Sequence, residues 1–258
     1  MHAYNFLNNV PHLKTKRTGL SMILDKGLGL NAASDLAQSA GEYIDFIKFG
    51  WGTAATFESA LVIQKNKIYH ANQILTYPGR TLLEVAIQTK KLDQFFKETA
   101  RLGFNAIEVS DGSTSIAKEI RDNVIFLARE KGFFVISEVG KKNPLLDHKF
   151  SIETRAAQIK SDLTSGSNLV IIEAREAGKN IGIYDENGNI LLEELDTLAK
   201  IGIDKLIFEA PLKKQQVDLI LKLGPQVNLG NIASADATSL ETLRTGLRGD
   251  TVGKINNG

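Results

Sequence analysis

The sequence contains no cysteine and little histidine. Among its 258 residues there are four histidines (His2, His12, His70 and His148), and they do not show the spacing of metal ligands. Disulfides and thiolate metal centres are therefore excluded. Any metal that the protein binds must be held mostly by oxygen atoms, which indicates Mg²⁺ or Mn²⁺.

Long apolar runs and an excess of charge of one sign are also missing. The N-terminus lacks the apolar core of a signal peptide, and no run approaches the roughly 20 apolar residues of a membrane span. The 31 basic and 30 acidic side chains nearly cancel and are interspersed. This pattern does not favour nucleic acid or anionic lipid as a partner. We therefore expect a soluble, cytoplasmic protein that binds neither nucleic acid nor a membrane.

The length of the chain indicates its domain organisation. A chain of 258 residues with 43% hydrophobic content has the usual size of a (β/α)8 barrel. We predict a single barrel domain over residues 1–258, in which residues 1–18 form a short N-terminal extension.

Strand-like and helix-like segments alternate from Gly19 to the C-terminus. Amphipathic segments such as SIAKEIRDNVIFLAREKG separate short apolar runs, and several of them stop at a glycine just before the next run. This alternation predicts parallel strands with right-handed crossovers, and eight of them can close into a barrel. An open, doubly wound sheet is the alternative. The expected strands are Leu20–Asp25, Phe46–Gly50, Gln73–Tyr77, Ala106–Ser110, Phe133–Glu138, Leu169–Glu173, Lys205–Glu209 and Val227–Gly230.

Four glutamates lie at equivalent places in four of these apolar runs. They are Glu108 in FNAIEVSDG, Glu138 in FFVISEVG, Glu173 in LVIIEARE and Glu209 in KLIFEAP. A buried carboxylate is costly unless a positive group pairs with it, and the carboxyl ends of barrel strands converge at the active site. We predict that the four share a cationic site, as ligands of a divalent ion. The alternative is that each pairs with a neighbouring lysine or arginine in a purely structural network.

Cationic side chains also lie at the expected strand ends. Lys141 and Lys142 follow Gly140, where a flexible ammonium can reach the barrel mouth and can change its protonation when desolvated. Carboxylates combined with such cations suit the binding of a divalent ion and an anionic substrate, with a lysine that moves a proton. For any single lysine, a solvated position in a loop is the alternative.

Three glycine-containing stretches, DKGLGLN, KFGWGT and NLGNI, come directly after expected strands. A glycine-rich turn before a helix exposes backbone N–H groups to phosphate, and barrels often bind phosphate near their last two strands. We therefore expect phosphate binding at these turns, although glycine also serves tight turns. Trp51, the only tryptophan, lies between two glycines and is expected to pack under a loop or to shield the site from water.

A set of ordered strings gives the chain a family resemblance. GLSMILDKGLGL, YIDFIKFGWGT, YPGRTLLE, IEVSDGS, SEVGKK, IIEAREAGKNIG, IFEAP, VNLGNI and LETLRTGLRGDT together resemble the phosphosulfolactate synthase family, from Gly19 to Thr251. The resemblance implies a (β/α)8 barrel. It also implies a carbon–sulfur lyase that adds sulfite to phosphoenolpyruvate, with Mg²⁺, to give (2R)-3-phosphosulfolactate, which can lead toward coenzyme M or sulfolactate.

The resemblance also implies roles for individual residues. The lysine pair of the EVGKK motif corresponds to Lys141 and Lys142, of which Lys142 is the expected proton donor and Lys141 its partner in anion binding. Glu108, Glu138, Glu173 and Glu209 become the candidate Mg²⁺ ligands. The candidate ligands of the substrate's anionic groups are Lys26, Lys48, Arg175, Asn231 and Arg248.

One motif departs from the family pattern. Where the pattern has PGGTLFE, this chain has PGRTLLE, so Arg80 replaces the second glycine. Arg80 either obstructs the substrate or supplies another anion contact. Two alternatives therefore stay open: a non-catalytic relative similar to plant heat-stress-associated proteins, and an enzyme that uses another nucleophile or enol phosphate. The apolar positions of AIQTKKLDQFF also lead us to expect a homo-oligomer.

Overall fold

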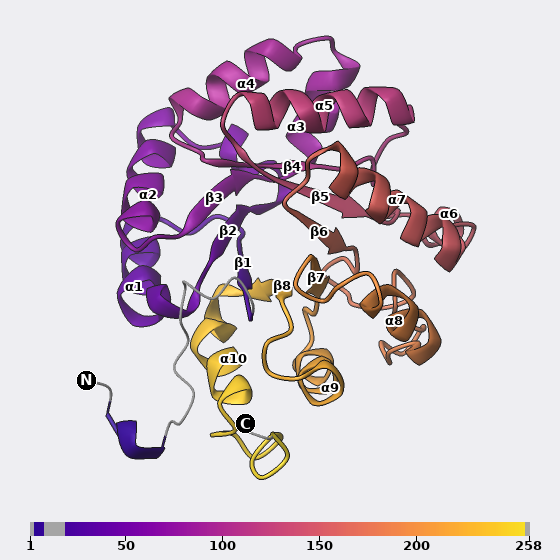
Figure 1. The fold of residues 1–258 in the computed structure, drawn as a ribbon. Coiled ribbons are helices and arrows are strands. Elements are labelled where there is room, and N and C mark those ends of the chain that lie inside the picture. Colours follow the sequence, from indigo (N-terminus) through magenta and orange to yellow (C-terminus); the bar gives the residue numbers. More distant parts are fainter. Residues whose placement is uncertain (1–2, 8–18, 256–258) are drawn as a thin grey trace.

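Eight parallel strands form the centre of the fold, in the order β3-β2-β1-β8-β7-β6-β5-β4. The computed structural model describes residues 3–7 and 19–255. In Figure 1 the strands form a central ring, and the helices that connect them lie around its outside. The predicted (β/α)8 barrel is therefore confirmed, and the open doubly wound sheet is not found.

Each expected strand is present, with shifts of up to three residues at its ends. The third and eighth strands begin two residues later than expected, and the eighth also ends three residues later, at Ala233. The strands are β1 (Ser21–Asp25), β2 (Phe46–Phe49), β3 (Leu75–Pro78), β4 (Ala106–Val109), β5 (Phe134–Val139), β6 (Leu169–Ile172), β7 (Leu206–Glu209) and β8 (Leu229–Ala233).

Helices follow the strands as expected, and glycines with positive φ end several of them. Gly103, Gly132, Gly202 and Gly224 all have this backbone conformation and each precedes a strand. The α-helices are α1 (Leu30–Ala40), α2 (Ser59–Ala71), α3 (Thr81–Gln88), α4 (Leu92–Arg101), α5 (Lys118–Glu130), α6 (Pro144–Asp147), α7 (Ile152–Ser165), α8 (Leu192–Ala199), α9 (Lys213–Leu223) and α10 (Ala237–Arg244). The 3-10 turns are η1 (Asn5–Leu7), η2 (Gly41–Tyr43), η3 (Gly50–Ala55) and η4 (Ser234–Asp236).

Both faces of the strands are apolar, because one face fills the barrel and the other packs against the helices. Met22 and Ile207 belong to the smaller cluster inside the ring. Ile23 and Phe208, one position along the same two strands, belong to the larger cluster that includes helix residues. Burial on both faces is typical of parallel strands and explains the continuous apolar runs of the sequence.

A side chain helps to close the barrel between β3 and β4. The strand ladder of the described residues runs round the barrel from β3 to β4 but does not join these two end strands. At this seam the amide N–H of Thr76 donates to Asn105 Oδ1 at 2.8 Å, and the N–H of Asn105 donates to the carbonyl of Thr76 at 3.3 Å. Beyond the seam β3 ends in Pro78, and the chain continues through Gly79 to Arg80.

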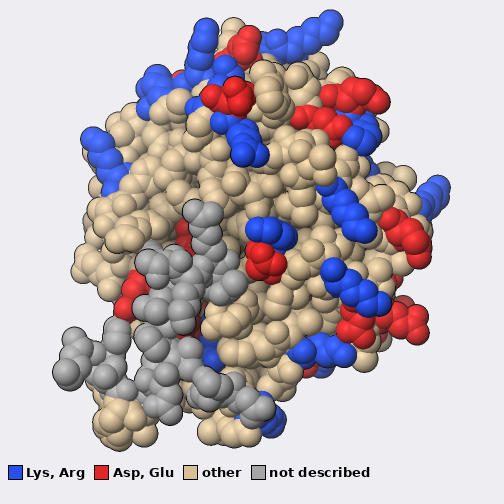
Figure 2. All heavy atoms as spheres, viewed as in Figure 1, with Lys and Arg blue, Asp and Glu red and all other residues tan. Residues whose placement is uncertain are grey.

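Charges of both signs are interspersed over the face shown in Figure 2, as the composition predicts. No helix in residues 3–7 and 19–255 is long and apolar enough to span a membrane. Of the expected N-terminal extension, residues 1–2 and 8–18 lie outside the described part of the chain. The single domain over residues 1–258 stays a prediction.

Replacing Asn105 should weaken the barrel at its seam. In the variant Asn105→Ala the amide of Thr76, a fully buried residue, loses its acceptor. We expect the free energy of unfolding in urea to fall by about 1–3 kcal/mol. The control Asn187→Ala, at an exposed loop position, should change it by less than about 0.5 kcal/mol. Equal small effects in the two variants would contradict the role of Asn105.

Candidate active site

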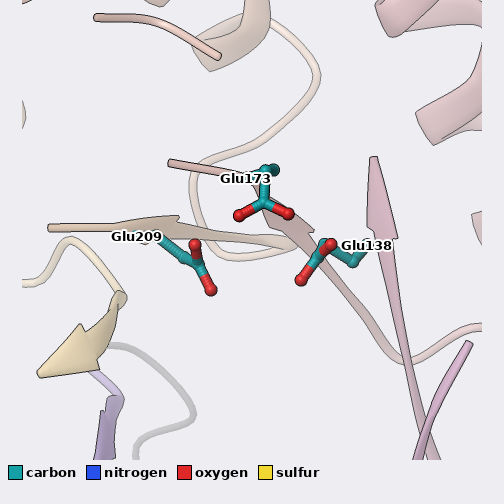
Figure 3. Close-up of side chains that lie close together, drawn as sticks. All are labelled: Glu138, Glu173 and Glu209. Atoms are coloured by element: carbon teal, nitrogen blue, oxygen red, sulfur yellow. The ribbon is translucent and has the colours of Figure 1, made fainter. Parts of the chain in front are cut away.

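Three of the four predicted glutamates meet at the carboxyl ends of neighbouring strands. Glu138 lies in β5, Glu173 directly follows β6, and Glu209 ends β7. One carboxylate oxygen of each lies within 4.8 Å of the others, and all three side chains are buried. Figure 3 shows the three carboxylates pointing toward one another. Their donor atoms are those that a hard divalent cation prefers.

Lys48 of β2 contacts the same carboxylates from across the barrel. Its Nζ donates to Glu108 Oε1 at 2.8 Å and lies 3.6 Å from Glu138 Oε2 and 3.8 Å from Glu209 Oε1. Glu108 thus contacts Lys48 and does not belong to the group of three that could share a metal ion. The structure places Lys48 as the shared counter-ion of carboxylates from three strands.

Arg80 is the second cation of this cluster. Its guanidinium pairs with Glu138 and Glu173, and its Nε lies 4.0 Å from Glu84 Oε1. The residue is buried, and its side chain passes closely under Gly112, where an added Cβ would lie 3.1 Å from the guanidinium carbon. The sequence indicated an obstruction or an anion contact, and it did not predict that Arg80 pairs with the glutamates themselves.

The nearby cations lower the pKa of one glutamate of the cluster, Glu173, whereas burial raises the pKa of another, Glu209. Burial raises the pKa of Glu173, but Arg80 and Lys48 outweigh it and lower that pKa to about 2. Burial, followed by the negative charge of Glu173, raises the pKa of Glu209 to about 8. The cluster therefore combines a carboxylate whose pKa is held low with one whose pKa is raised.

A cavity of about 370 Å³ lies at the carboxyl ends of the strands. Its volume is within the range of small-molecule sites. The predicted site residues Lys48, Lys142, Glu173, Arg175, Glu209 and Asn231 line it, together with Leu24, Gly50, Trp51, Gly79, Arg80, Thr81 and Glu176.

The two predicted catalytic lysines take different positions. The N–H of Lys142 donates to the carbonyl of Gly112 at 3.1 Å, and its Nζ lies 3.4 Å from Thr81 Oγ1, on the cavity wall. Lys141 Nζ instead pairs with the carboxylate of Asp111 and donates to that residue's carbonyl at 2.9 Å. The structure brings Lys142 into the cavity and leaves Lys141 outside its lining.

The ammonium of Lys142 has a lowered pKa. Burial is the largest cause, and the positive charge of Arg80 is the second, opposed by Glu173 and Glu84. A lysine whose pKa is lowered toward the working pH is a more effective proton donor than a solvated lysine.

Arg175 and Asn231 adopt a backbone conformation that is rare outside glycine. Their φ angles are 59° and 56°, and Trp51, also on the cavity, has a φ of 57°. The side-chain amide of Asn231 donates from Nδ2 to the backbone carbonyl of Arg175 at 2.8 Å. The backbone N–H of Arg175 donates to Glu173 Oε1 at 2.7 Å. Such strain is concentrated at functional sites, where the surrounding structure holds it.

Two other predicted cations lie away from the cavity lining. Lys26 lies over the ring of Trp51, with its Nζ 4.7 Å from the ring centroid. Trp51 in turn donates from Nε1 to Glu176 Oε2 at 3.0 Å. Arg248 lies with its Nε 3.6 Å from Asp250 Oδ2 and does not line the cavity.

The glycine stretches need two corrections. In DKGLGLN, Asp25 Oδ1 accepts the N–H groups of Gly27 at 2.9 Å and Leu28 at 2.8 Å, so these amides are already satisfied. The position of NLGNI after the last strand was wrong, because LGNI lies within β8. A Cβ on Gly230 would lie 2.7 Å from Met22 Cε, so this glycine serves close packing inside the barrel.

The fold and the cavity define a class, a (β/α)8 barrel with a cavity of small-molecule size at the carboxyl ends of its strands. Solved structures with this fold include the YdjI aldolase of Escherichia coli K12, with a TM-score of 0.56 and 12% identity over 87% of this chain and 79% of that one. Phosphonopyruvate hydrolase, in a complex with oxalate and Mg²⁺, has a TM-score of 0.54 and 12% identity over 92% of this chain and 85% of its own. At these identities the likeness supports the fold alone.

The sequence comparison is more specific. The profile of (2R)-phospho-3-sulfolactate synthase (ComA) matches residues 10–250, and the chain belongs to this family of enzymes. Proteins named phosphosulfolactate synthase are 45% identical in Methanothermobacter thermautotrophicus and 48% identical in Methanocaldococcus jannaschii, each over 99% of this chain and 100% of the relative. The protein HEAT-STRESS-ASSOCIATED 32 of Arabidopsis thaliana is 22% identical over 84% of this chain and 81% of its own.

Removal of Lys48 should destabilise the barrel strongly. In the variant Lys48→Met, Glu108 loses its nearest cation while buried. We expect the free energy of unfolding to fall by about 3–5 kcal/mol, as for other broken buried ion pairs. The control Lys213→Met removes an exposed pair with Asp250 and should cost less than about 1 kcal/mol. Urea unfolding of both variants checks this, and similar losses would contradict it.

Proposed function

We propose that the protein catalyses the addition of sulfite to phosphoenolpyruvate, with Mg²⁺, to give (2R)-3-phosphosulfolactate. The observation that carries this proposal is the cavity itself, in which Lys48, Lys142 and Arg175 line one space together with Glu173 and Glu209. A substrate with a phosphate and a carboxylate needs several cations, and a new C–H bond needs a proton donor. Membership of the synthase family supports the same reaction.

In the proposed reaction the sulfur of sulfite attacks the methylene carbon of phosphoenolpyruvate and forms the C–S bond. The electrons of the double bond move to the adjacent carbon and its carboxylate, which gives an enediolate-like species. A proton must then reach that adjacent carbon from one face. Lys142 is the proposed donor, because it lines the cavity and its pKa is lowered by burial.

The other cations of the cavity would hold the anionic groups of the two substrates. Arg175 can bind a carboxylate or phosphate through two parallel hydrogen bonds. Its backbone conformation, with φ of 59°, determines the direction in which its side chain leaves the backbone. Lys48 and Asn231 line the same cavity. Lys26 and Arg248 stay candidates for the outer part of the site. Lys141 stays the candidate partner of Lys142 in anion binding, and its bonds to Asp111 hold the segment that carries both lysines.

The metal would be held by Glu138, Glu173 and Glu209, whose carboxylate oxygens lie close enough to share one ion. This donor set fits Mg²⁺, which takes one or a few carboxylates and keeps several waters. The ion would supply positive charge that stabilises the negative charge developing on the substrate carboxylate. In this chain the same carboxylates already contact Arg80 and Lys48. Glu108 stays a candidate ligand of lower rank, because it pairs with Lys48.

Arg80 favours one second candidate, a related enzyme that uses another nucleophile or another enol phosphate. Arg80 lines the cavity beside Thr81 and adds a cation at a position where the family resemblance implies glycine. Phosphorus NMR of the protein with phosphoenolpyruvate, sulfite and Mg²⁺ separates the two. A new phosphate-ester resonance that requires both sulfite and the metal supports the synthase. No resonance with sulfite, from folded protein, contradicts it.

Self-association and a cytoplasmic location are also part of the proposal. Support for a homo-oligomer comes from the apolar groove of about 520 Å³ beside α3 and α4, which includes Leu82, Val85 and Phe95. Light scattering during size-exclusion chromatography measures the oligomeric state, and a monomer at micromolar concentration would contradict it.

Replacement of Lys142 by alanine should abolish most of the activity without loss of stability. We expect kcat to fall roughly 10²- to 10⁴-fold, the usual contribution of a positioned acid. The thermal unfolding curve should stay nearly unchanged, because the only hydrogen bond of Lys142 Nζ described is a long one, 3.4 Å, to Thr81. Lys149→Ala, an exposed lysine, is the matched control and should keep full activity. A large loss of stability in Lys142→Ala would count against a role in chemistry.

The pH dependence of kcat should report the ammonium of Lys142. A proton donor is active below its pKa, so activity should fall as the pH rises through a pKa lower than the ordinary 10.5. Because Arg80 contributes to lowering this pKa, the variant Arg80→Gln should move the alkaline limb to higher pH. A pH–rate profile of both proteins measures the shift, and a limb that stays in place would argue against Lys142 as the donor.

A further inference from the structure

Arg80 holds the position of a cation in the glutamate cluster, and we propose that it competes with the divalent ion for Glu138 and Glu173. The inference rests on the metal site of the proposed function and concerns what this chain's own arginine does at that site.

The competition follows from where the guanidinium lies. It pairs with two of the three carboxylates that could share a metal ion. A magnesium ion binds carboxylate oxygens at about 2.0–2.1 Å and needs their lone pairs. Arg80 Nη2 donates to Glu173 Oε2, and Arg80 Nη1 forms an ion pair with Glu138 Oε1, so the guanidinium occupies oxygen atoms of the same carboxylates. Full occupancy by both cations would also place two positive centres next to each other, so one must retreat when the other binds.

Arg80 is held in this position by its surroundings. Its side chain is only 5% exposed. The guanidinium lies against Gly112 of the loop after β4, where an added Cβ would lie 3.1 Å from its central carbon. Glu84, one helical turn later in α3, lies near its Nε and also accepts the N–H of Ser113 at 3.1 Å. The guanidinium is therefore packed between α3 and the loop after β4, and it cannot leave the cluster as freely as a side chain on the cavity rim.

The charge balance of the cluster points the same way. Glu108, Glu138, Glu173 and Glu209 are buried together with Lys48, and Arg80 adds a second positive charge among them. In a chain with glycine at this position, Glu173 would face the cavity without a guanidinium, and a divalent ion would be its natural partner. With Arg80 present, the cluster carries one unit less of negative charge. Its electrostatic attraction for a divalent ion is therefore weaker. We therefore expect weak divalent-ion binding in this chain.

The test is a titration of the purified full-length protein with Mn²⁺, followed by electron paramagnetic resonance of the free ion. Wild-type protein should bind Mn²⁺ weakly, whereas Arg80→Gln and Arg80→Gly should bind it more tightly by about tenfold or more, the scale on which groups around a metal site change its affinity. The double variant Arg80→Gln/Glu173→Gln should lose the gain, because one ligand of the cluster is then neutral.

Two controls make the cause specific. Arg244→Gln removes another buried arginine, whose guanidinium bonds the carbonyls of Leu20 and Val227 at the opposite end of the barrel, and should leave Mn²⁺ binding unchanged. In Arg80→Gly, free guanidinium at millimolar, non-denaturing concentration should weaken Mn²⁺ binding again by entering the vacated position. The same addition should have no effect on wild-type protein.

Equal Mn²⁺ affinity in wild type and Arg80→Gln, or no Mn²⁺ binding by either, would overturn the proposal. If Arg80→Gln and Arg80→Gly fail to fold, Arg80→Lys replaces them, since its single ammonium cannot span both carboxylates. Mn²⁺ should then raise its Tm more than that of wild type, and an equal increase overturns the proposal. Failure of the proposed reaction is separate, because it shows as the absence of a new phosphate ester from wild-type protein whatever the Mn²⁺ affinities are.

Discussion

The neutralisation of four buried glutamates is the constraint on which the centre of this barrel depends. Parallel strands bring the carboxyl ends of β4 to β7 together, and a cluster of carboxylates without water or counter-ions would be very costly there. Lys48 compensates much of this negative charge from the opposite side of the barrel. Its Nζ lies between 2.8 and 3.8 Å from carboxylate oxygens of Glu108, Glu138 and Glu209. The ammonium of Lys48 thus connects strands that are not neighbours in the sheet. The same ion pairs stabilise the closed barrel and set the charge at its carboxyl end.

The same constraint sets the pKa values of the glutamates that line the cavity, Glu173 and Glu209. Arg80 and Lys48 keep the pKa of Glu173 at about 2, whereas Glu209, which is buried beside that charge, has a pKa of about 8. One carboxylate with a low pKa and one with a raised pKa therefore lie together, with oxygens within 4.8 Å of each other. On the wall, Lys142 has its pKa lowered by burial and by Arg80. Donors and acceptors of protons with separated pKa values are the arrangement that acid–base chemistry near neutral pH requires.

The fold and part of the site could be predicted because their signals are local. Strand runs, glycine stops and the repeated position of a glutamate are readable from adjacent residues, and the structure confirms the barrel. The eighth strand continues three residues past its expected end, because Gly230, a residue type that often marks a turn, here packs against Met22 inside the barrel. The partners of Arg80 could not be predicted, since Glu173 is 93 positions away and the path of the side chain depends on Gly112. Nor could local spacing distinguish Arg175, which lines the cavity, from Arg248, which does not.

Arg80 shows how one buried side chain can alter the charge of a site without straining the backbone. Its backbone at the N-terminus of α3 is helical, with φ −47° and ψ −34°, so an arginine is accommodated there without backbone strain. The cost and the gain are both electrostatic: burial of a guanidinium is unfavourable alone, and the adjacent carboxylates outweigh it and raise its pKa. A fixed guanidinium is directional, whereas a metal ion is exchangeable and can contact the substrate directly. A chain that carries its own cation therefore gains a partly neutralised cluster, and in the proposed function it does so at the expense of affinity for the ion that the reaction uses.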